Sequence, residues 1–278
     1  MENSFGRPFG SVLHVCASYR VFEFLLTSFP GHYRLWVNGI HHGDISYKNL
    51  MYDISGTEEP IGILNDFDLA TWVDHPTANN DRTGTIPFMA IDLLEGGLDD
   101  CRPRLYRHDM ESFVWVLAYI TVAYIEYKGD TIKISPLPNV DAWFRDEHEA
   151  DRSAHVWSKR LLHSDYGRKQ RVSGRYGRYI NTVRQMTRYL YQFHEDVRAK
   201  EYEGHPLQPN PIPFWEDQVP KMAEVDDPAY SLKLFITMVE ASLGEGGVGD
   251  GFAEVNTLLL EAINTPIVMG RAVNVESV

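Results

Sequence analysis

The sequence predicts a mainly α-helical α+β fold with one small β element near residues 40–65. Two observations lead to this fold class. Apolar residues recur three or four positions apart in several long stretches, which is the spacing of a helix with one buried face. Near residues 40–65, two short segments of β-like composition flank the turn-rich sequence DISGTEEP.

The first expected helix spans Tyr19–Asn38, because its apolar residues keep helical spacing. Pro30 and Gly31 are expected to break or kink this helix, since proline lacks a backbone N–H. The two expected strands are Leu50–Tyr52 and Ile61–Leu64.

The longest apolar run is Phe113–Ile125, interrupted only by Thr121. It is shorter than the ~20 residues that a membrane-spanning helix needs, so it predicts a buried helix beginning at Asp109. Further periodic stretches predict three more helices, at Asp141–Leu162, Tyr179–Val197 and Tyr230–Leu243.

Two segments are typical of linkers and suggest how the chain is divided. Gly204–Pro213 is rich in proline, and Gly244–Gly251 is rich in glycine and precedes a short expected helix at Phe252–Ile263. We therefore expect one domain over residues 1–203 and a C-terminal helical extension over residues 204–278.

Composition narrows the class of protein. The formal net charge of −13 argues against a general nucleic-acid binder. Cys16 and Cys101 are the only cysteines, too few for a disulfide framework, so an intracellular home in cytoplasm or nucleus is expected. The start of the sequence has no secretory pattern, and no membrane association is expected.

The stretch HHGDISYKNL places Asp44 five residues before Asn49, and a second carboxylate follows as Asp66 in ILNDFDLA. Phosphate transfer from ATP needs a carboxylate that orients the attacking hydroxyl and accepts its proton, together with oxygen ligands for Mg²⁺. Asp44 suits the first role, and Asn49 and Asp66 suit the second. Alternatively, Asp44 and Asn49 are turn residues and Asp66 caps a helix.

With the stretches RTGTIPFMAIDLL and RHDMESFVWVLAYI, these motifs resemble the fungal-type protein kinase family. The later AWFRDEHEADRSAHVWSKRLL is similar to that family's tryptophan-then-lysine segment. The resemblance covers about residues 6–163 and continues faintly to 245. It implies a kinase-like C-terminal lobe and serine/threonine phosphorylation of a protein substrate with ATP and Mg²⁺.

The resemblance also implies roles for individual residues. Asp44 would be the catalytic base, Asn49 and Asp66 would hold Mg²⁺ and thereby ATP, and Thr85 would lie in the loop that receives the substrate hydroxyl. Three further residues would have structural roles. His42 would pack under Asp66–Phe67, and Asp92 would stand in the place of the Ala-Pro-Glu glutamate. Asp109 would hydrogen-bond the catalytic-loop backbone.

Three residues depart from the usual kinase pattern. Gly43 replaces the arginine that pairs with a phosphorylated activation loop, so activation by loop phosphorylation is not expected. Ser46 stands where serine/threonine kinases carry a lysine. Lys48 could supply that missing charge to the transferred phosphate, or it could be a solvated surface lysine.

The residues before the catalytic loop lack the glycine-rich strands and the Val-Ala-Ile-Lys pattern of a kinase upper lobe. Gly244–Gly249 fits Gly-x-Gly-x-x-Gly literally, but it follows a helix and is read as a linker. The N-terminal lobe is thus expected to be missing, so an upper lobe or regulator would come from elsewhere, and this chain alone would transfer phosphate poorly.

Two other functions remain open. Gly43 favours a small-molecule phosphotransferase of the aminoglycoside or choline kinase kind, whereas RTGTIPFMA opposes one. A non-catalytic, pseudokinase-like binding module would explain the missing lobe. The stretch Arg152–Arg178 holds eight Lys/Arg and one acidic residue, Asp165, and either docks an acidic peptide or is a solvated loop.

Overall fold

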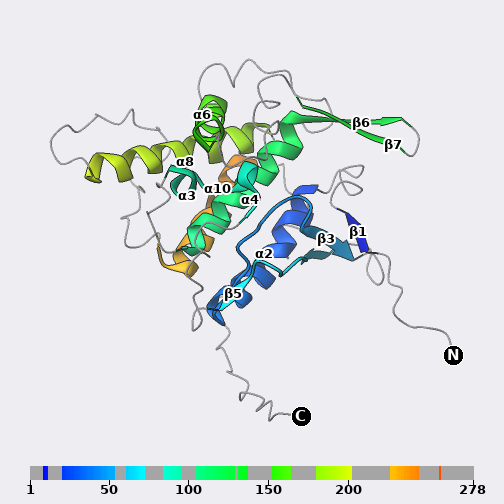
Figure 1. The fold of residues 1–278 in the computed structure, drawn as a ribbon, viewed down its shortest axis with the longest axis horizontal. Helices are drawn as coiled ribbons and strands as arrows, with labels where there is room; N and C mark the ends of the chain where they lie inside the picture. The colour runs from blue at the N-terminus through cyan, green and yellow to red at the C-terminus, as the bar shows by residue number, and fades with distance from the viewer. Residues whose placement is uncertain are drawn as a thin grey trace, which may run out of the picture.

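The computed structural model describes residues 9–11, 21–53, 61–72, 84–95, 104–128, 131–136, 152–163, 180–201, 226–243 and 257. Within these ranges the protein is mainly helical with small antiparallel sheets, which agrees with the expected α+β class (Figure 1). No helix in the described ranges is long and apolar enough to cross a membrane.

The first helix, α2, spans Val21–Val37 and contains Pro30. Of the two outcomes expected at Pro30, a break is wrong, because the helix continues for seven residues beyond it, and a kink stays a prediction. Phe29 explains why this helix stays in place: its ring makes edge contacts with Phe113 and Phe235, at centroid distances of 4.8 and 4.9 Å. These contacts join α2 to two other helices in one core.

The β element is confirmed and is larger than expected. Strands β3 (Leu50–Asp53) and β4 (Ile61–Leu64) pair antiparallel, and β1 (Phe9–Ser11) adds to the free edge of β3. A separate two-stranded ladder joins β2 (Ile40–His41) to β5 (Thr71–Trp72). The loop between β2 and β3 carries the sequence GDISYKN, so the two ladders fix both of its ends.

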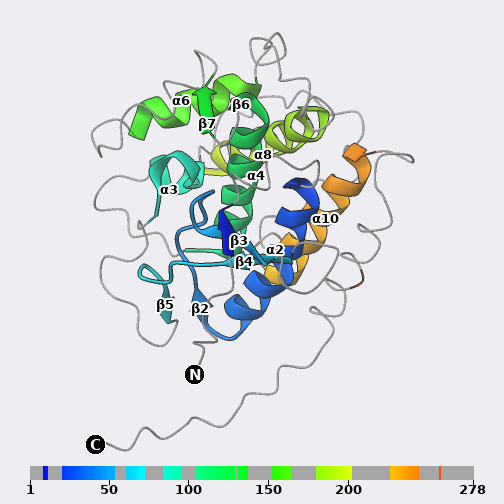
Figure 2. The ribbon, with the colours of Figure 1, turned by 90° about the vertical axis from the view of Figure 1, so that its right-hand side faces the viewer.

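The buried helix α4 spans Tyr106–Val122, and it lies between α2 and α8 (Figures 1 and 2). It begins three residues before the expected start at Asp109, which lies in its first turn. The end of the apolar run is not helical, because β6 (Ala123–Lys128) follows and pairs with β7 (Thr131–Pro136). Every side chain of α4 from His108 to Thr121 is buried, as the run predicted.

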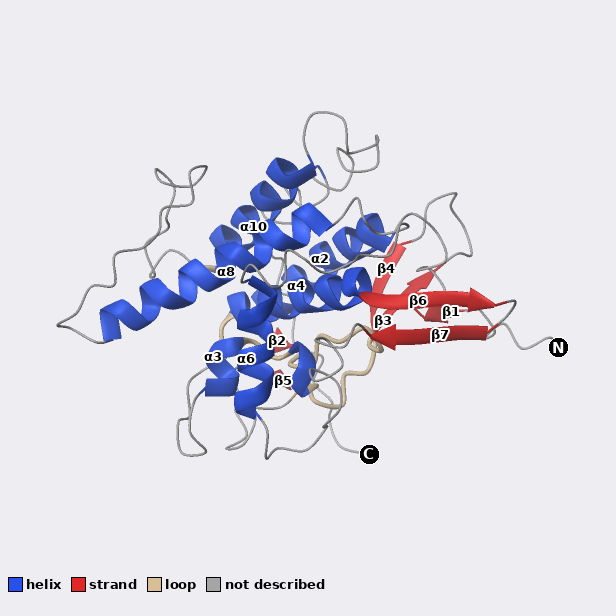
Figure 3. Ribbon diagram, turned by 90° about the horizontal axis from the view of Figure 1, so that it is seen from above, coloured by secondary structure: helices blue, strands red, loops and turns tan. Residues whose placement is uncertain are grey.

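Ahead of α4 lie a short 3-10 helix, η2 (Ile86–Phe88), and α3 (Ile91–Glu95). The remaining helices are α6 (Arg152–His163), α8 (Ile180–Glu201) and α10 (Pro228–Leu243). They pack around α4 and against one another, and α6 also rests on α3 and η2. In Figure 3 strands β1, β3, β4, β6 and β7 lie at one end of the helices, where α2 packs against β4 and α4 leads directly into β6.

The predicted helices at Tyr179–Val197 and Tyr230–Leu243 are thus confirmed within a few residues. The helix expected over Asp141–Leu162 is described only from Arg152 onward. The linkers at 204–213 and 244–251 and most of the last expected helix lie outside the described residues, so the division at residue 203 stays a prediction.

Candidate active site

Asp44 lies in the loop between β2 and β3, and neutral donors occupy both oxygens of its carboxylate. Oδ1 accepts hydrogen bonds from the backbone N–H of Thr85 at 2.6 Å and from its hydroxyl at 2.7 Å. Oδ2 accepts one from Nδ2 of Asn49 at 2.8 Å. The carboxylate is therefore held in one orientation while its residue remains partly exposed.

Asn49 is buried and uses its amide nitrogen twice, because Nδ2 also donates to the Asp44 backbone carbonyl at 2.9 Å. Its side-chain carbonyl oxygen is left as an acceptor. Its backbone carbonyl accepts a hydrogen bond from the N–H of Asn65 at 2.9 Å, so the residue just before Asp66 is tied to the catalytic-loop candidate.

Asp66 follows β4 and has a φ of 63°, a left-handed backbone conformation that is uncommon outside glycine. Its side chain is exposed and makes no hydrogen bond or ion pair with other described residues. Strained backbone of this kind recurs at functional sites. The unpaired carboxylate is therefore available to a ligand.

His42 connects the two acidic residues through its ring. Nε2 lies 3.0 Å from the Asn65 carbonyl oxygen, and Nδ1 accepts a hydrogen bond from the Asp44 N–H at 3.3 Å. Its ring packs on Phe67, with centroids 4.8 Å apart, as expected for a histidine beneath the Asp66–Phe67 segment. Burial lowers the pKa of His42, so the ring stays neutral and acts as a spacer.

Glycines allow the close approach between the Asp44 loop and the Thr85 segment. Gly43 has a φ of 78° and Gly84 a φ of 133°, and a Cβ on Gly84 would lie 2.9 Å from the Gly43 carbonyl oxygen. A larger residue at Gly84 would push the two segments apart. The positive φ of Gly43 thus explains why a glycine stands at this position, and the explanation does not depend on which reaction the site performs.

Ser46 and Lys48, the two residues expected near the transferred phosphate, differ in their exposure. Lys48 is exposed, as either reading of it allowed. Ser46 is buried, and its hydroxyl has no hydrogen-bond partner among the described residues. No contact joins Lys48 to the Asp44 carboxylate within the described ranges, so its catalytic role stays a prediction.

Asp109 is fully buried, and its contacts differ from those the resemblance implied. Its carboxylate oxygens accept bonds from Nε of Arg104 and Nε2 of His32, each at 2.9 Å, instead of from the catalytic-loop backbone. Burial alone would raise the pKa of Asp109, but Arg104 and His32 outweigh burial and hold that pKa well below its usual range. Asp109 therefore acts as a structural anchor between α2 and α4.

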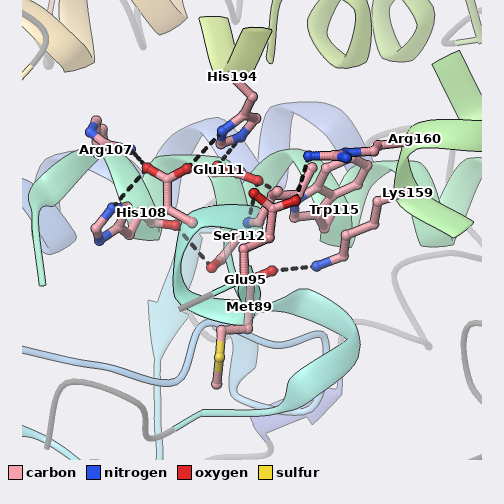
Figure 4. A network of polar contacts seen from close by, with 12 residues as sticks. Met89, Glu95, Arg107, His108, Glu111, Ser112, Trp115, Lys159, Arg160 and His194 are labelled. Atoms are coloured by element: carbon pink, nitrogen blue, oxygen red, sulfur yellow. Dashed lines mark hydrogen bonds and ion pairs between the residues drawn. The ribbon is translucent and has the colours of Figure 1, made fainter. Parts of the chain in front are cut away.

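Asp92 belongs to a buried network of charged groups, and its partners Arg107, His108 and His194 are labelled in Figure 4. Its Oδ1 lies 2.8 Å from Nδ1 of His194, and its Oδ2 lies 2.5 Å from Nη1 of Arg107 and 3.6 Å from Nε2 of His108. Burial opposes ionisation, but these partners keep the pKa of Asp92 far below its usual range. The structural position expected for Asp92 thus has a clear physical basis.

The network continues through Glu111, whose role the sequence did not indicate. Its Oε2 lies 3.1 Å from Nε2 of His194, and its Oε1 accepts bonds from the Ile91 N–H at 2.8 Å and the Trp115 indole N–H at 2.9 Å. Burial opposes the charged form of His194, yet Glu111 and Asp92 raise the pKa of His194 to about 9. The network therefore locks α3, α4 and α8 together.

Two cations on α6 extend these contacts towards the Thr85 segment. Nζ of Lys159 donates a hydrogen bond to the Met89 carbonyl, and Arg160 pairs with Glu95 at the surface of α3 (Figure 4). Lys159 was counted with the basic stretch Arg152–Arg178, for which a solvated loop was one reading. That reading is wrong for residues 152–163, because they form a helix and Lys159 is buried within it.

A magnesium site was expected at Asn49 and Asp66. The described residues contain no cluster of three or more His, Cys, Asp or Glu side chains placed to hold a metal. A magnesium ion bound to phosphates needs only one or two protein oxygens and keeps waters for its other positions. The free carbonyl oxygen of Asn49 and the unpaired carboxylate of Asp66 fit that requirement.

Comparison with known proteins adds one match. Residues 4–121 match the family model described as fungal protein kinase, a segment that holds Asp44, Asn49, Asp66, Thr85 and Asp109. No curated protein matches the chain. The resemblance stated from HHGDISYKNL and LNDFDLA is therefore confirmed: over residues 4–121, this chain matches the fungal protein kinase family.

Proposed function

We propose that this chain is the catalytic lower lobe of a protein kinase, which transfers the γ-phosphate of ATP to a serine or threonine hydroxyl. The observation that carries the proposal is the Asp44 carboxylate, oriented by Asn49 on one oxygen and by Thr85 on the other. Phosphate transfer depends mostly on such positioning, since the protein has little covalent chemistry to perform.

The order of the parts along the chain supports this reaction. Asp44 and Asn49 come first, Asp66 follows a hairpin, and Asp92 follows the Thr85 segment, which is the order of the corresponding protein kinase motifs. The backbone bond between Asn65 and Asn49 brings the first two parts together across that hairpin.

In the proposed reaction, Asp44 accepts the proton of the substrate hydroxyl as that oxygen attacks the γ-phosphorus. Asn49 and Asp66 would hold Mg²⁺, which neutralises charge on the phosphates when it is bound. Thr85 holds Asp44 and flanks the position of the incoming hydroxyl. Lys48 is exposed and is the one lysine or arginine in the loop between β2 and β3, so it is the candidate in this loop for pairing with the transferred phosphate.

Binding of ATP also needs an upper lobe that covers the nucleotide and a lysine that contacts its α- and β-phosphates. The sequence before α2 holds no Val-Ala-Ile-Lys pattern, so we propose that other residues, in a longer chain or in another polypeptide, complete the site. Because a loosely held phosphate loses most of the benefit of proximity, the 278 residues alone should bind Mg-ATP weakly and transfer phosphate slowly.

Two neighbouring carboxylates provide a matched test. Asp66→Ala removes the proposed metal ligand, whereas Asp68→Ala removes an equally exposed carboxylate two residues away. We expect Mg²⁺-dependent thermal stabilisation by ATP, and slow transfer to a generic protein substrate, to be lost in Asp66→Ala and kept in Asp68→Ala. Equal behaviour of the two variants would contradict the metal site, and transfer to aminoglycosides or choline instead of protein would favour a small-molecule phosphotransferase.

A further inference from the structure

Lys159 is a buried lysine that the proposed reaction does not use. Its side chain is 1% exposed, and its Nζ donates a hydrogen bond to the backbone carbonyl of Met89. The same nitrogen lies 5.0 Å from the centroid of the Trp115 ring, over one face of the indole. Figure 4 shows the Lys159 side chain reaching from α6 to the end of η2.

Removing an amine from water is costly unless the site returns strong contacts. Burial lowers the pKa of Lys159 to about 7, with Glu111 acting in the opposite direction. The Met89 carbonyl can accept a hydrogen bond from either the charged or the neutral amine. The hydrogen bond to Met89 therefore persists in both protonation states. This indicates that the function of Lys159 is to hold the Met89 carbonyl.

Met89 ends a short turn whose other end touches the catalytic-base candidate. The N–H of Met89 donates to the Ile86 carbonyl at 3.1 Å, and the N–H of Phe88 donates to the Thr85 carbonyl at 2.8 Å. Thr85 then gives both of its hydrogen bonds to Asp44. The path from Lys159 to Asp44 thus runs through one hydrogen-bonded turn, residues 85–89.

The side chain of Met89 also lies beside the Asp44 loop. A Cβ on Gly84 would stand 3.6 Å from Met89 Cε and 3.8 Å from Asp44 Oδ1. A shift of Met89 would therefore disturb Gly84 and the carboxylate next to it. Because misplacing reacting groups by ~1 Å can lower a rate about 10²-fold, a remote residue that fixes this turn can affect the chemistry.

We propose that Lys159 is a positioning residue for phosphate transfer: by holding the Met89 carbonyl, it fixes the turn 85–89 so that Thr85 keeps both hydrogen bonds to Asp44. This inference rests on the proposed function. Packing alone gives a competing explanation, since Phe88 makes edge contacts with Tyr47 and Tyr119, at centroid distances of 5.7 and 5.8 Å. In the competing explanation, ring packing fixes the turn 85–89, and Lys159 contributes only to the overall stability of the fold.

Lys159→Met separates the two explanations, because methionine has a similar length and no donor. The substitution leaves the Met89 carbonyl without its donor, but it also removes the cost of burying an amine, so we expect a melting temperature close to that of the wild type. We expect faster hydrogen exchange at the amides of Thr85, Phe88 and Met89, with the amides of α4 unchanged. Lys233→Met, at an exposed position on α10, is the matched control and should leave all of these unchanged.

Lys159→Arg tests whether a donor is what matters, since arginine keeps donors at this position. It should retain wild-type protection at Thr85. In transfer assays, Lys159→Met should lower kcat about tenfold or more and leave the Mg-ATP affinity unchanged, because neither Asn49 nor Asp66 is affected.

The exchange measurement needs no turnover, so it also separates failure of this inference from failure of the proposed function. Faster exchange at Thr85 in Lys159→Met, with no transfer by the wild type even when an upper lobe is supplied, would keep the role of Lys159 in fixing the turn 85–89 and reject the kinase reaction. Unchanged exchange at Thr85, or loss of protection throughout the protein together with a lower melting temperature, would overturn the positioning role.

Discussion

Two regions of this protein each contain carboxylates, but the partners of those carboxylates are charged in one region and neutral in the other. In the buried network, Asp92 and Glu111 face Arg107, His108 and His194. In the loop site, Asp44 is oriented by Asn49 and Thr85, which are neutral donors. The difference separates carboxylates that stabilise the fold through ion pairs from a carboxylate that has no cationic partner among the described residues.

The physical consequence concerns what each carboxylate can still do. In the network, the pKa of Asp92 and that of Glu111 lie below their usual values, because cationic and polar partners outweigh burial. Such groups stay ionised but cannot exchange their partners without unfolding. Asp44, in contrast, has no cation paired with its carboxylate among the described residues, and Asp66 is exposed and unpaired there, so both can engage a substrate or ligand.

The largest effect on stability should come from breaking the network at His194. His194→Leu removes the cation between Asp92 and Glu111 and leaves two buried carboxylates short of a partner. Removing one partner of a buried pair costs about 3–5 kcal/mol, and we expect a loss of that order in urea unfolding. Gln185→Ala, at an exposed position on the same helix, should cost less than about 0.5 kcal/mol. A similar, small loss in both variants would remove the contrast between the regions.

An intermediate effect, on activity alone, should follow loss of the Thr85 hydroxyl. Thr85→Val keeps the shape and the backbone donor but removes the hydroxyl bond to Asp44 Oδ1. A hydrogen bond to a charged group contributes about 1.5–3 kcal/mol, so kcat/KM should fall roughly 10- to 150-fold. Thr85→Ser should recover most of the rate. If the serine and valine variants are equally slow, the hydroxyl is not what orients Asp44.

A smaller effect should appear in the pH dependence of stability. His194 has a folded pKa of about 9, above its unfolded value of ~6.5, so its contribution is complete below about pH 6.5 and is lost as pH rises through 9. Lys159 has a folded pKa of about 7, below its unfolded value of ~10.4. Burying its charged amine therefore destabilises the fold fully below pH 7, and this destabilisation is relieved as pH rises to about 10.4.

Between pH 7 and 9 these two slopes oppose each other, each at about 1.4 kcal/mol per pH unit. The wild-type free energy of unfolding should therefore change little from this pair over that interval. Lys159→Met should unmask the His194 slope, so its stability relative to the wild type should fall with rising pH. Parallel pH profiles of the two proteins, measured by urea unfolding, would show that Lys159 does not titrate in this way.

Much of the fold could be predicted because local patterns determine it. Strands β3 and β4 flank a turn-rich sequence that marks their hairpin, and α4 follows from its apolar run. Strands β1, β2 and β5 are two or three residues long, too short to leave a pattern. The change from α4 to β6 falls inside one apolar run, where composition shows no boundary.

The site divides in the same way. Asp44, Asn49 and Asp66 could be proposed as site residues from the sequence, because their spacing along the chain is itself the motif. Glu111 and His194 lie 83 positions apart, and Met89 and Lys159 lie 70 apart, so nothing local marks either pair.

Lys159 did carry one local signal, which the count of basic residues obscured. In the helix Arg152–His163, Val156 and Lys159 lie three positions apart and are both buried, so they share the face that packs inward. A lysine on the apolar face of a periodic helix indicates a buried amine, although the sequence does not show which carbonyl it reaches.

The measurement that tests the central claim most directly is the rate of phosphate transfer from Mg-ATP to a protein substrate by the wild type and by Asp44→Asn. Asparagine keeps the size and an acceptor oxygen for Thr85 but loses the acceptor for Asn49 Nδ2, so the variant should fold with a melting temperature only slightly below that of the wild type. General base catalysis contributes about 10²–10⁴-fold, so we expect slow, Mg²⁺-dependent transfer by the wild type and a reduction of that order in the variant. Equal rates in the two proteins, or no transfer by either when an upper lobe is supplied, would contradict a catalytic role for Asp44 and favour the binding module.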